Sequence, residues 1–144
     1  MKNFLVLIPF LCTLLFSQSI QVVDQFHKNG LPKVVHHYRE SNNRLELFQK
    51  TFYHSNGQKE KEGTYFNGSK DRKWKEWRKD GTLMEEGNYE NGDKHGKWIH
   101  WGKNGKKLKE GKYVHGEKDG VWVKFTPNGF KLWEKNYYHG EQID

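Results

Sequence analysis

The chain has 144 residues, of which only 33% are hydrophobic, and its formal net charge at pH 7 is +7. It nevertheless contains 9 Phe, 7 Tyr and 6 Trp, which excludes an intrinsically disordered chain and predicts one domain whose core is built from rings. Basic residues are interleaved with acidic ones, so the charge excess allows weak attraction to anionic lipids, glycans or acidic proteins without selecting among them.

The first element expected is a secretory signal peptide, residues 1–19. A short positive start precedes an uncharged apolar run, residues 4–16, which is too short to span a membrane comfortably as a helix. Cleavage after Ser17 or Ser19 would export the mature chain to the periplasm, the cell surface or the medium; a retained anchor is the alternative. The only cysteine, Cys12, lies in this run, so the mature protein would have no disulfide and no Cys-ligated zinc.

Residues 20–55 are expected to form a degenerate first repeat that caps the N-terminal end of an array. The sequence Phe26-His27-Lys28-Asn29-Gly30 resembles residues 53–57, at an offset of 27 residues, with extra residues around positions 41–46. An atypical terminal unit is what a repeat array needs, because an open sheet edge must be capped or blunted.

Residues 56–140 consist of a 24-residue repeat without insertion or deletion. Its columns are Trp74, Trp98 and Trp122; Trp77, Trp101 and Phe125; Gly57, Gly81, Gly105 and Gly129; Glu62, Glu86, Glu110 and Glu134; Tyr65, Tyr89, Tyr113 and Tyr137; and Gly68, Gly92, Gly116 and Gly140. A fixed period of this length predicts an architecture in which each unit buries apolar surface against its neighbours.

Asn or Asp precedes every glycine of the third column, as in Asp80-Gly81. This dipeptide favours a two-residue type I′ turn, so each unit is expected to be a β-hairpin. The predicted fold is therefore all-β, a single-layer antiparallel sheet of consecutive hairpins of about 24 residues. Residues 141–144 are expected to form a frayed C-terminal tail.

A two-residue turn at Asp80-Gly81 fixes a register for the hairpin. The register pairs Trp77 with Met84, Trp74 with Gly87, Lys75 with Glu86, Trp101 with Leu108, Trp98 with Gly111 and Phe125 with Leu132. Aromatic against aliphatic is a pairing that sheets prefer, and a glycine opposite a large ring lets the indole lie flat over bare backbone.

Alternation along the strands places the two aromatic columns on opposite faces of the sheet. The structural residues expected on the core face are Trp74, Trp98, Trp122, Gly87, Gly111, Tyr89 and Tyr113, forming a continuous run of rings. The residues expected to bind a partner on the other face are Trp77, Trp101, Phe125, Lys75, Met84 and Leu108. The glutamate column lies on that second face, where Lys75 and its neighbours are expected to pair with it.

The order N-G, E-G-x-Y, N-G, G-x-W resembles the MORN-repeat variant of bacterial proteins often labelled YwqK-family antitoxins. One copy of this motif begins at Asp80-Gly81, continues through Glu86-Gly87-Asn88-Tyr89 and Asn91-Gly92, and ends at Gly96-Lys97-Trp98. The resemblance implies a single-layer sheet of hairpins and a role as a binding or assembly scaffold, and it brings no catalytic residues. A secretory signal disfavours the antitoxin role, because an exported protein would meet a toxin only outside the cytoplasm.

No catalytic residue, metal ligand or cofactor is expected. His115 and His139 occupy a turn position held by asparagine in earlier units, and turn or surface roles are favoured over metal binding for the histidines. A glycosidase needs two carboxyl groups at a defined separation with one raised pKa, whereas the glutamate column recurs in every unit and reads as structural.

The expected function is that of an exported, non-catalytic scaffold that binds another macromolecule, foremost a protein, through one face of the sheet. The alternative is binding of cell-wall glycan or another polysaccharide, since exposed rings stack on sugars. Nucleic acid is disfavoured because of the signal peptide, and the oligomeric state stays open.

Overall fold

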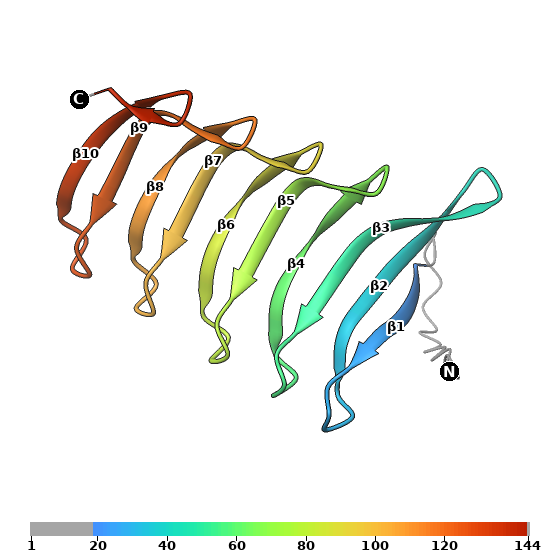
Figure 1. The fold of residues 1–144 in the computed structure, drawn as a ribbon. Coiled ribbons are helices and arrows are strands. Elements are labelled where there is room, and N and C mark those ends of the chain that lie inside the picture. The colour runs from blue at the N-terminus through green and yellow to red at the C-terminus, as the bar shows by residue number, and fades with distance from the viewer. Residues whose placement is uncertain (1–18, 144) are drawn as a thin grey trace, which may run out of the picture.

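The computed structural model describes residues 19–143, which form one open antiparallel sheet of 11 strands in chain order (Figure 1). The strands are β1 (Ile20–Phe26), β2 (Pro32–Ser41), β3 (Arg44–Tyr53), β4 (Lys59–Phe66), β5 (Ser69–Trp77), β6 (Leu83–Glu90), β7 (Asp93–Trp101), β8 (Lys107–Val114), β9 (Glu117–Phe125), β10 (Lys131–Tyr138) and β11 (Glu141–Gln142). Each strand pairs with the next, which confirms the predicted fold of consecutive hairpins. The predicted signal peptide lies outside the described residues, apart from Ser19. Within the described range no helix could cross a membrane.

The turns form two rows, one at each end of the strands, called here the lower and upper rows as Figure 1 shows them. The lower row contains the predicted Asn/Asp-Gly corners, but these are not type I′ turns. Arg78 N donates to Thr82 O and Gly81 N to Arg78 O, both at 2.9 Å, and only Gly81 of this loop has a positive φ, of 82°. The loop therefore has three residues and ends in a glycine bulge, the type I arrangement common in hairpins.

Type I′ turns occupy the upper row instead. Asn91 (φ 51°) and Gly92 (φ 98°) are both left-handed and lie between the paired residues Glu90 and Asp93. The equivalent turns are Asn42-Asn43, Asn67-Gly68, His115-Gly116 and His139-Gly140. Asparagine, histidine and glycine tolerate this conformation better than branched residues do, which explains why they recur at these turns.

The predicted register is correct in the middle of the hairpins and wrong by one residue beside the lower turns. Trp74 pairs with Gly87 and Lys75 with Glu86, as expected, but Trp77 pairs with Leu83. The third loop residue causes the shift, because it makes Met84 the extra residue of a bulge. Leu108 and Leu132 are bulge residues for the same reason, so Trp101 pairs with Lys107 and Phe125 with Lys131.

Each core tryptophan stacks on a glycine, but on the glycine of the preceding unit. Trp98 pairs with Gly111, yet its ring covers Gly87, where an added Cβ would lie 2.2 Å from Trp98 Cδ2. Trp74 covers Gly63 and Trp122 covers Gly111 in the same way. Two extra residues bulge out of the strand before each tryptophan, and at this bulge Trp98 Nε1 donates to Asn88 O at 3.0 Å.

The predicted run of rings is confirmed, and it makes the core of the array. Trp74, Trp98 and Trp122 are 2%, 3% and 0% exposed. The tyrosine column alternates with them in edge-to-face contact; Trp98 lies 5.2 Å from Tyr89 and 6.0 Å from Tyr113 between ring centroids.

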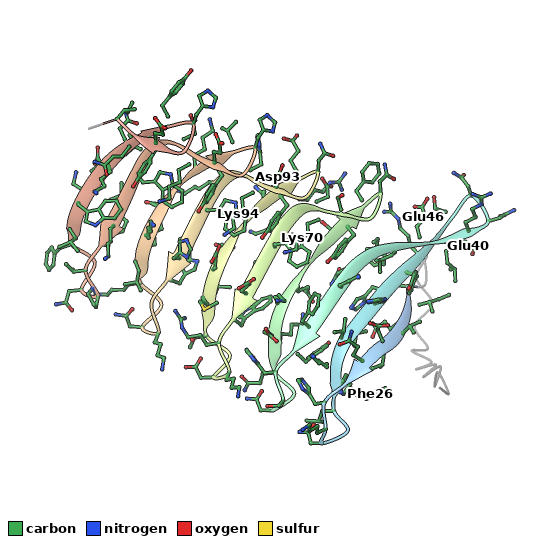
Figure 2. The ribbon with its side chains drawn as sticks, viewed as in Figure 1. Phe26, Glu40, Glu46, Lys70, Asp93 and Lys94 are labelled. Carbon is green, nitrogen blue, oxygen red and sulfur yellow. The ribbon has the colours of Figure 1, made fainter. Side chains whose placement is uncertain are left out.

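A lysine column that the sequence analysis missed covers the rings. Lys94 Nζ lies 3.7 Å from the Trp98 ring centroid and 5.4 Å from that of Tyr113. Lys70 and Lys118 repeat the arrangement one unit before and one unit after, and Figure 2 shows Lys70 and Lys94 at equivalent places near the upper row. Burial lowers the pKa of Lys70. Residues 19–143 form a single sheet, so these stems and cation–π contacts seal the core where no second layer of the described chain covers it.

Both ends of the array depart from the repeat. At the N-terminal end the extra residues lengthen the β2–β3 hairpin, Lys50 occupies the tryptophan column, and Val34, Val35 and Thr51 are buried. At the C-terminal end the expected frayed tail instead adds a short strand, β11, which pairs with Tyr137 and Tyr138.

Side chains of the lower row tie each unit to the next. Asn56 Nδ2 donates to Lys79 O at 2.7 Å, and Asn104 Nδ2 donates to Pro127 O at 2.8 Å. His54 Nε2 donates to the carbonyl of Trp77 at 2.9 Å, one unit ahead. The repeat therefore fixes neighbouring turns to one another as well as the strands between them.

Candidate interaction surface

The face opposite the core tryptophans is the contact face, defined by Trp77, Trp101 and Phe125. Trp74 and Trp77 lie three residues apart in β5 without an intervening bulge in that strand, so their side chains point to opposite faces. The same spacing separates Trp98 from Trp101. The structure thus supports the separation of the two aromatic columns on which the predicted binding residues depend.

The predicted binding residues are less exposed than expected. Trp77, Trp101, Phe125, Lys75, Met84 and Leu108 are all half-buried. Lys59 Nζ lies 5.9 Å from the Trp77 ring centroid, and the Trp101 Nε1 atom is buried without a hydrogen-bond partner among the described residues. The aromatic stripe is therefore partly covered by its neighbours, of which Lys59 beside Trp77 is one.

The glutamate column forms ion pairs on the contact face, but with lysines other than Lys75. Glu86 pairs with Lys73 at 3.3 Å, although Lys75 is its backbone partner. The remaining pairs are Glu62 with Lys59 (2.6 Å), Glu110 with Lys97 (2.9 Å) and Lys107 (3.1 Å), and Glu134 with Lys131 (2.9 Å). Each glutamate of the column therefore has at least one lysine partner, although the position of that lysine differs between units.

Glu110 shows the electrostatics of this column. Partial burial alone would raise the pKa of its carboxyl, but the hydrogen bonds and charges of Lys97 and Lys107 outweigh burial and lower the pKa. The carboxylate is held ionised at neutral pH, as a structural ion-pair partner would be.

Aliphatic side chains that the sequence analysis did not single out enlarge the apolar part of this face. Val121, Val123 and Phe125 alternate along β9 and share the contact face, and Val121 is 52% exposed. Ile99 and Trp101 lie on the same face of β7, two strands away. We call these five residues the β7–β9 patch.

The sequence columns of the repeat already indicate this patch. The columns read Lys73, Lys97, Val121; then Lys75, Ile99, Val123; then Trp77, Trp101, Phe125. Charged residues give way to aliphatic ones toward the C-terminal end, so the apolar character of the contact face increases from β5 to β9. A shallow hollow there is lined by Lys97, Glu110, Lys112, Val121 and Val123, among others.

The histidines that the sequence placed in turns are found there. His115 (φ 48°) and His139 (φ 46°) are the first residues of type I′ turns in the upper row. One set of side chains in residues 19–143, Glu90, His95 and His115, has potential metal-binding atoms that all lie within 4.8 Å of one another.

Comparison with models of known protein families finds no match for this chain, and comparison with curated proteins finds none either.

Proposed function

We propose that the protein is an exported, non-catalytic scaffold of the MORN-like kind that binds another protein through the β7–β9 patch of its contact face. The observation that carries the proposal is the split between the two faces. The core face is closed by its own tryptophans, tyrosines and lysines, whereas the contact face presents aliphatic residues that the array covers only in part, with Val121 the most exposed. Exposed apolar groups rimmed by charges are typical of protein contact sites.

The composition of the patch favours a protein over a glycan as the partner. Stacking on a sugar requires freely exposed ring faces, while Trp101 and Phe125 are half-buried and the most exposed member of the patch is a valine. Lys97, Glu110 and Lys112 supply both signs of charge around it, which suits a protein surface of mixed charge. Export depends on residues 1–19 acting as a signal peptide, and the antitoxin label rests on resemblance alone.

The test uses two variants of one strand that carry the same change in charge. Val121→Asp places a carboxylate on the contact face, and Lys124→Gln removes a cation from the opposite face of β9. Immobilised chain from residue 20 onward is incubated with an envelope fraction, the bound material is identified, and its affinity is measured for each variant. We expect a single protein partner whose Kd rises at least about tenfold with Val121→Asp and is unchanged with Lys124→Gln.

Two outcomes would contradict the proposal. Equal binding by Val121→Asp and the wild type would remove the β7–β9 patch from the interaction. Retention of polysaccharide in place of protein, lost on Trp101→Ala, would establish the glycan alternative. Circular dichroism and urea unfolding of both variants separate loss of binding from loss of fold.

A further inference from the structure

Three side chains with metal-binding donor atoms meet at the upper row of turns. Glu90 is the last residue of β6, His95 lies near the start of β7, and His115 opens the turn between β8 and β9. Gly116 N donates to Lys94 O at 2.9 Å, which holds this turn against the strand of the preceding hairpin and brings His115 beside His95. Their imidazole centroids are 5.8 Å apart.

The array needs none of these three residues at its own position. The column of His95 has aspartate in the neighbouring units (Asp71, Asp119). The columns of the other two residues read Phe66, Glu90, Val114, Tyr138 and Asn67, Asn91, His115, His139. The combination of a carboxylate and two imidazoles thus occurs at one junction between units, and the hairpin geometry does not account for it.

The Nδ1 atom of His95 lies beside the Glu90 carboxylate without forming a hydrogen bond to it. This nitrogen is buried, has no hydrogen-bond partner of acceptable geometry among the described residues, and lies 3.2 Å from Glu90 Oε2. A His95–Glu90 ion pair would account for those two residues but not for His115. Arg72, which lines the same hollow as Glu90 and His95, has an 84% exposed side chain and pairs with Asp71 at 3.4 Å.

Asp93 adds negative charge at the same junction. A Cβ built on Gly116 would lie 3.8 Å from the carboxyl carbon of Asp93, so this side chain borders the turn that carries His115. Figure 2 shows Asp93 at the upper row of turns. Glu90 and Asp93 thus place two carboxylates at this junction, and carboxylates attract a cation.

We propose that Glu90, His95 and His115 bind one divalent first-row transition-metal ion, for which Zn²⁺ is the probe. Two imidazoles and one carboxylate suit Zn²⁺, Co²⁺, Ni²⁺ or Cu²⁺, whereas Mg²⁺ and Ca²⁺ require more oxygen ligands. A tetrahedral zinc site with bonds of about 2.0–2.1 Å places its ligand atoms roughly 3.3 Å apart. The exposed side chains of Glu90 and His115 reach that spacing by rotation about their own bonds, and the fourth position is left for water.

The repeat supplies matched variants for the test. His115→Asn installs the residue found at Asn67 and Asn91, so the type I′ turn is preserved. His139→Asn makes the same change one unit later, where Asp119 stands in place of a second histidine, and it serves as the control. His95→Asn is close in shape to the aspartate of its column.

Titration calorimetry with Zn²⁺ on the full chain without an affinity tag, and the visible absorption of added Co²⁺, report binding. We expect one equivalent of Zn²⁺ per chain, no competition from Mg²⁺ or Ca²⁺, and a Kd at least about tenfold higher for His95→Asn and for His115→Asn. His139→Asn is expected to bind as the wild type does, and urea unfolding without metal confirms that the variants fold.

Three results would overturn the site. The first is the absence of saturable binding at one equivalent in the wild type. The second is wild-type affinity in both His95→Asn and His115→Asn. The third is an equal loss of affinity in His139→Asn, which would show that exposed histidines bind the ion without a defined site.

Discussion

Gly87→Ala tests the stacking of indole on glycine that holds the units together. Gly87 does not have a left-handed φ, so alanine causes no backbone strain there. Its Cβ would nevertheless lie 2.2 Å from Trp98 Cδ2 and 2.3 Å from Cε2. Ordinary carbon contacts are about 3.5–4.0 Å, so the ring must move by more than about 1 Å.

The surroundings of Trp98 resist that movement. Tyr89 and Tyr113 contact its edges, and Lys94 Nζ lies 3.7 Å from the ring centroid. Overpacking costs about 1–3 kcal/mol, and displacement of the ring would weaken the hydrogen bond from Trp98 Nε1 to Asn88 O, at a further cost of about 1 kcal/mol. We therefore expect Gly87→Ala to destabilise the protein by about 2–4 kcal/mol, whereas alanine in an ordinary strand position would stabilise it by about 0.5–1 kcal/mol.

Urea unfolding followed by circular dichroism and tryptophan fluorescence measures the free energy of unfolding. Lys135→Ala is the control, because Lys135 occupies the same column in β10, and β11, the strand on its far side, contains no tryptophan. This change is expected to stay within about 0.5 kcal/mol. A Gly87→Ala variant as stable as the wild type, or a control that is destabilised equally, would refute the reasoning.

Three further predictions concern other parts of the array. Trp98→Ala is expected to destabilise the protein by about 3 kcal/mol or more, while Trp101→Ala should cost less stability and weaken partner binding; equal destabilisation in urea would defeat the split between the faces. Burial, followed by the charges of Glu76 and Glu85, raises the pKa of Tyr89 to about 12. Because an unfolded tyrosine ionises near pH 10, the stability contributed by neutral Tyr89 is complete below about pH 10 and is lost as pH rises to about 12. Tyr89→Phe should make the alkaline fall in unfolding midpoint shallower, and an unchanged pH profile would contradict this. Arg72 has a φ of 56° where later units have Gly96 and Gly120, so Arg72→Gly should stabilise by up to about 1 kcal/mol; a lower thermal midpoint would argue against it.

The repeat period predicted the hairpins, their order and the two aromatic faces, because a fixed register forces equivalent side chains to equivalent places. It could not decide between the two Gly rows of each unit. Asn56-Gly57 and Asn67-Gly68 are the same dipeptide, yet the first closes a three-residue loop and the second a type I′ turn. Local turn chemistry permits both, and the pairing of the whole strand selects one.

The direction of the indole stacking was open to inference from the two ends of the array. Gly63 has Lys50 on one side and Trp74 on the other, while Lys135 pairs with Trp122 and has β11, a strand without tryptophan, on its other side. Glycine is thus present where a tryptophan follows and absent where one only precedes. This contrast indicates that the tryptophan of the following strand is the ring that requires the glycine.

The candidate site was predictable in outline only. Alternation along the strands placed Trp77 and Trp101 on the contact face. No sequence rule gives the fraction of each ring that neighbouring side chains cover. Val121 escaped notice because it replaces lysine in its column, and only comparison between units reveals such a change. The cluster of Glu90, His95 and His115 depends on the hydrogen bond from Gly116 to Lys94, which joins residues of different hairpins.

Lys135 bears on how such a protein can change length during evolution. A duplicated 24-residue segment inserted in the interior would find a glycine on one side and an indole on the other, so it could join without altering its neighbours. The same segment added after β10 would bring its tryptophan against a long charged side chain. A copy could therefore be accommodated in the interior of the array, whereas one placed directly after β10 would clash with Lys135.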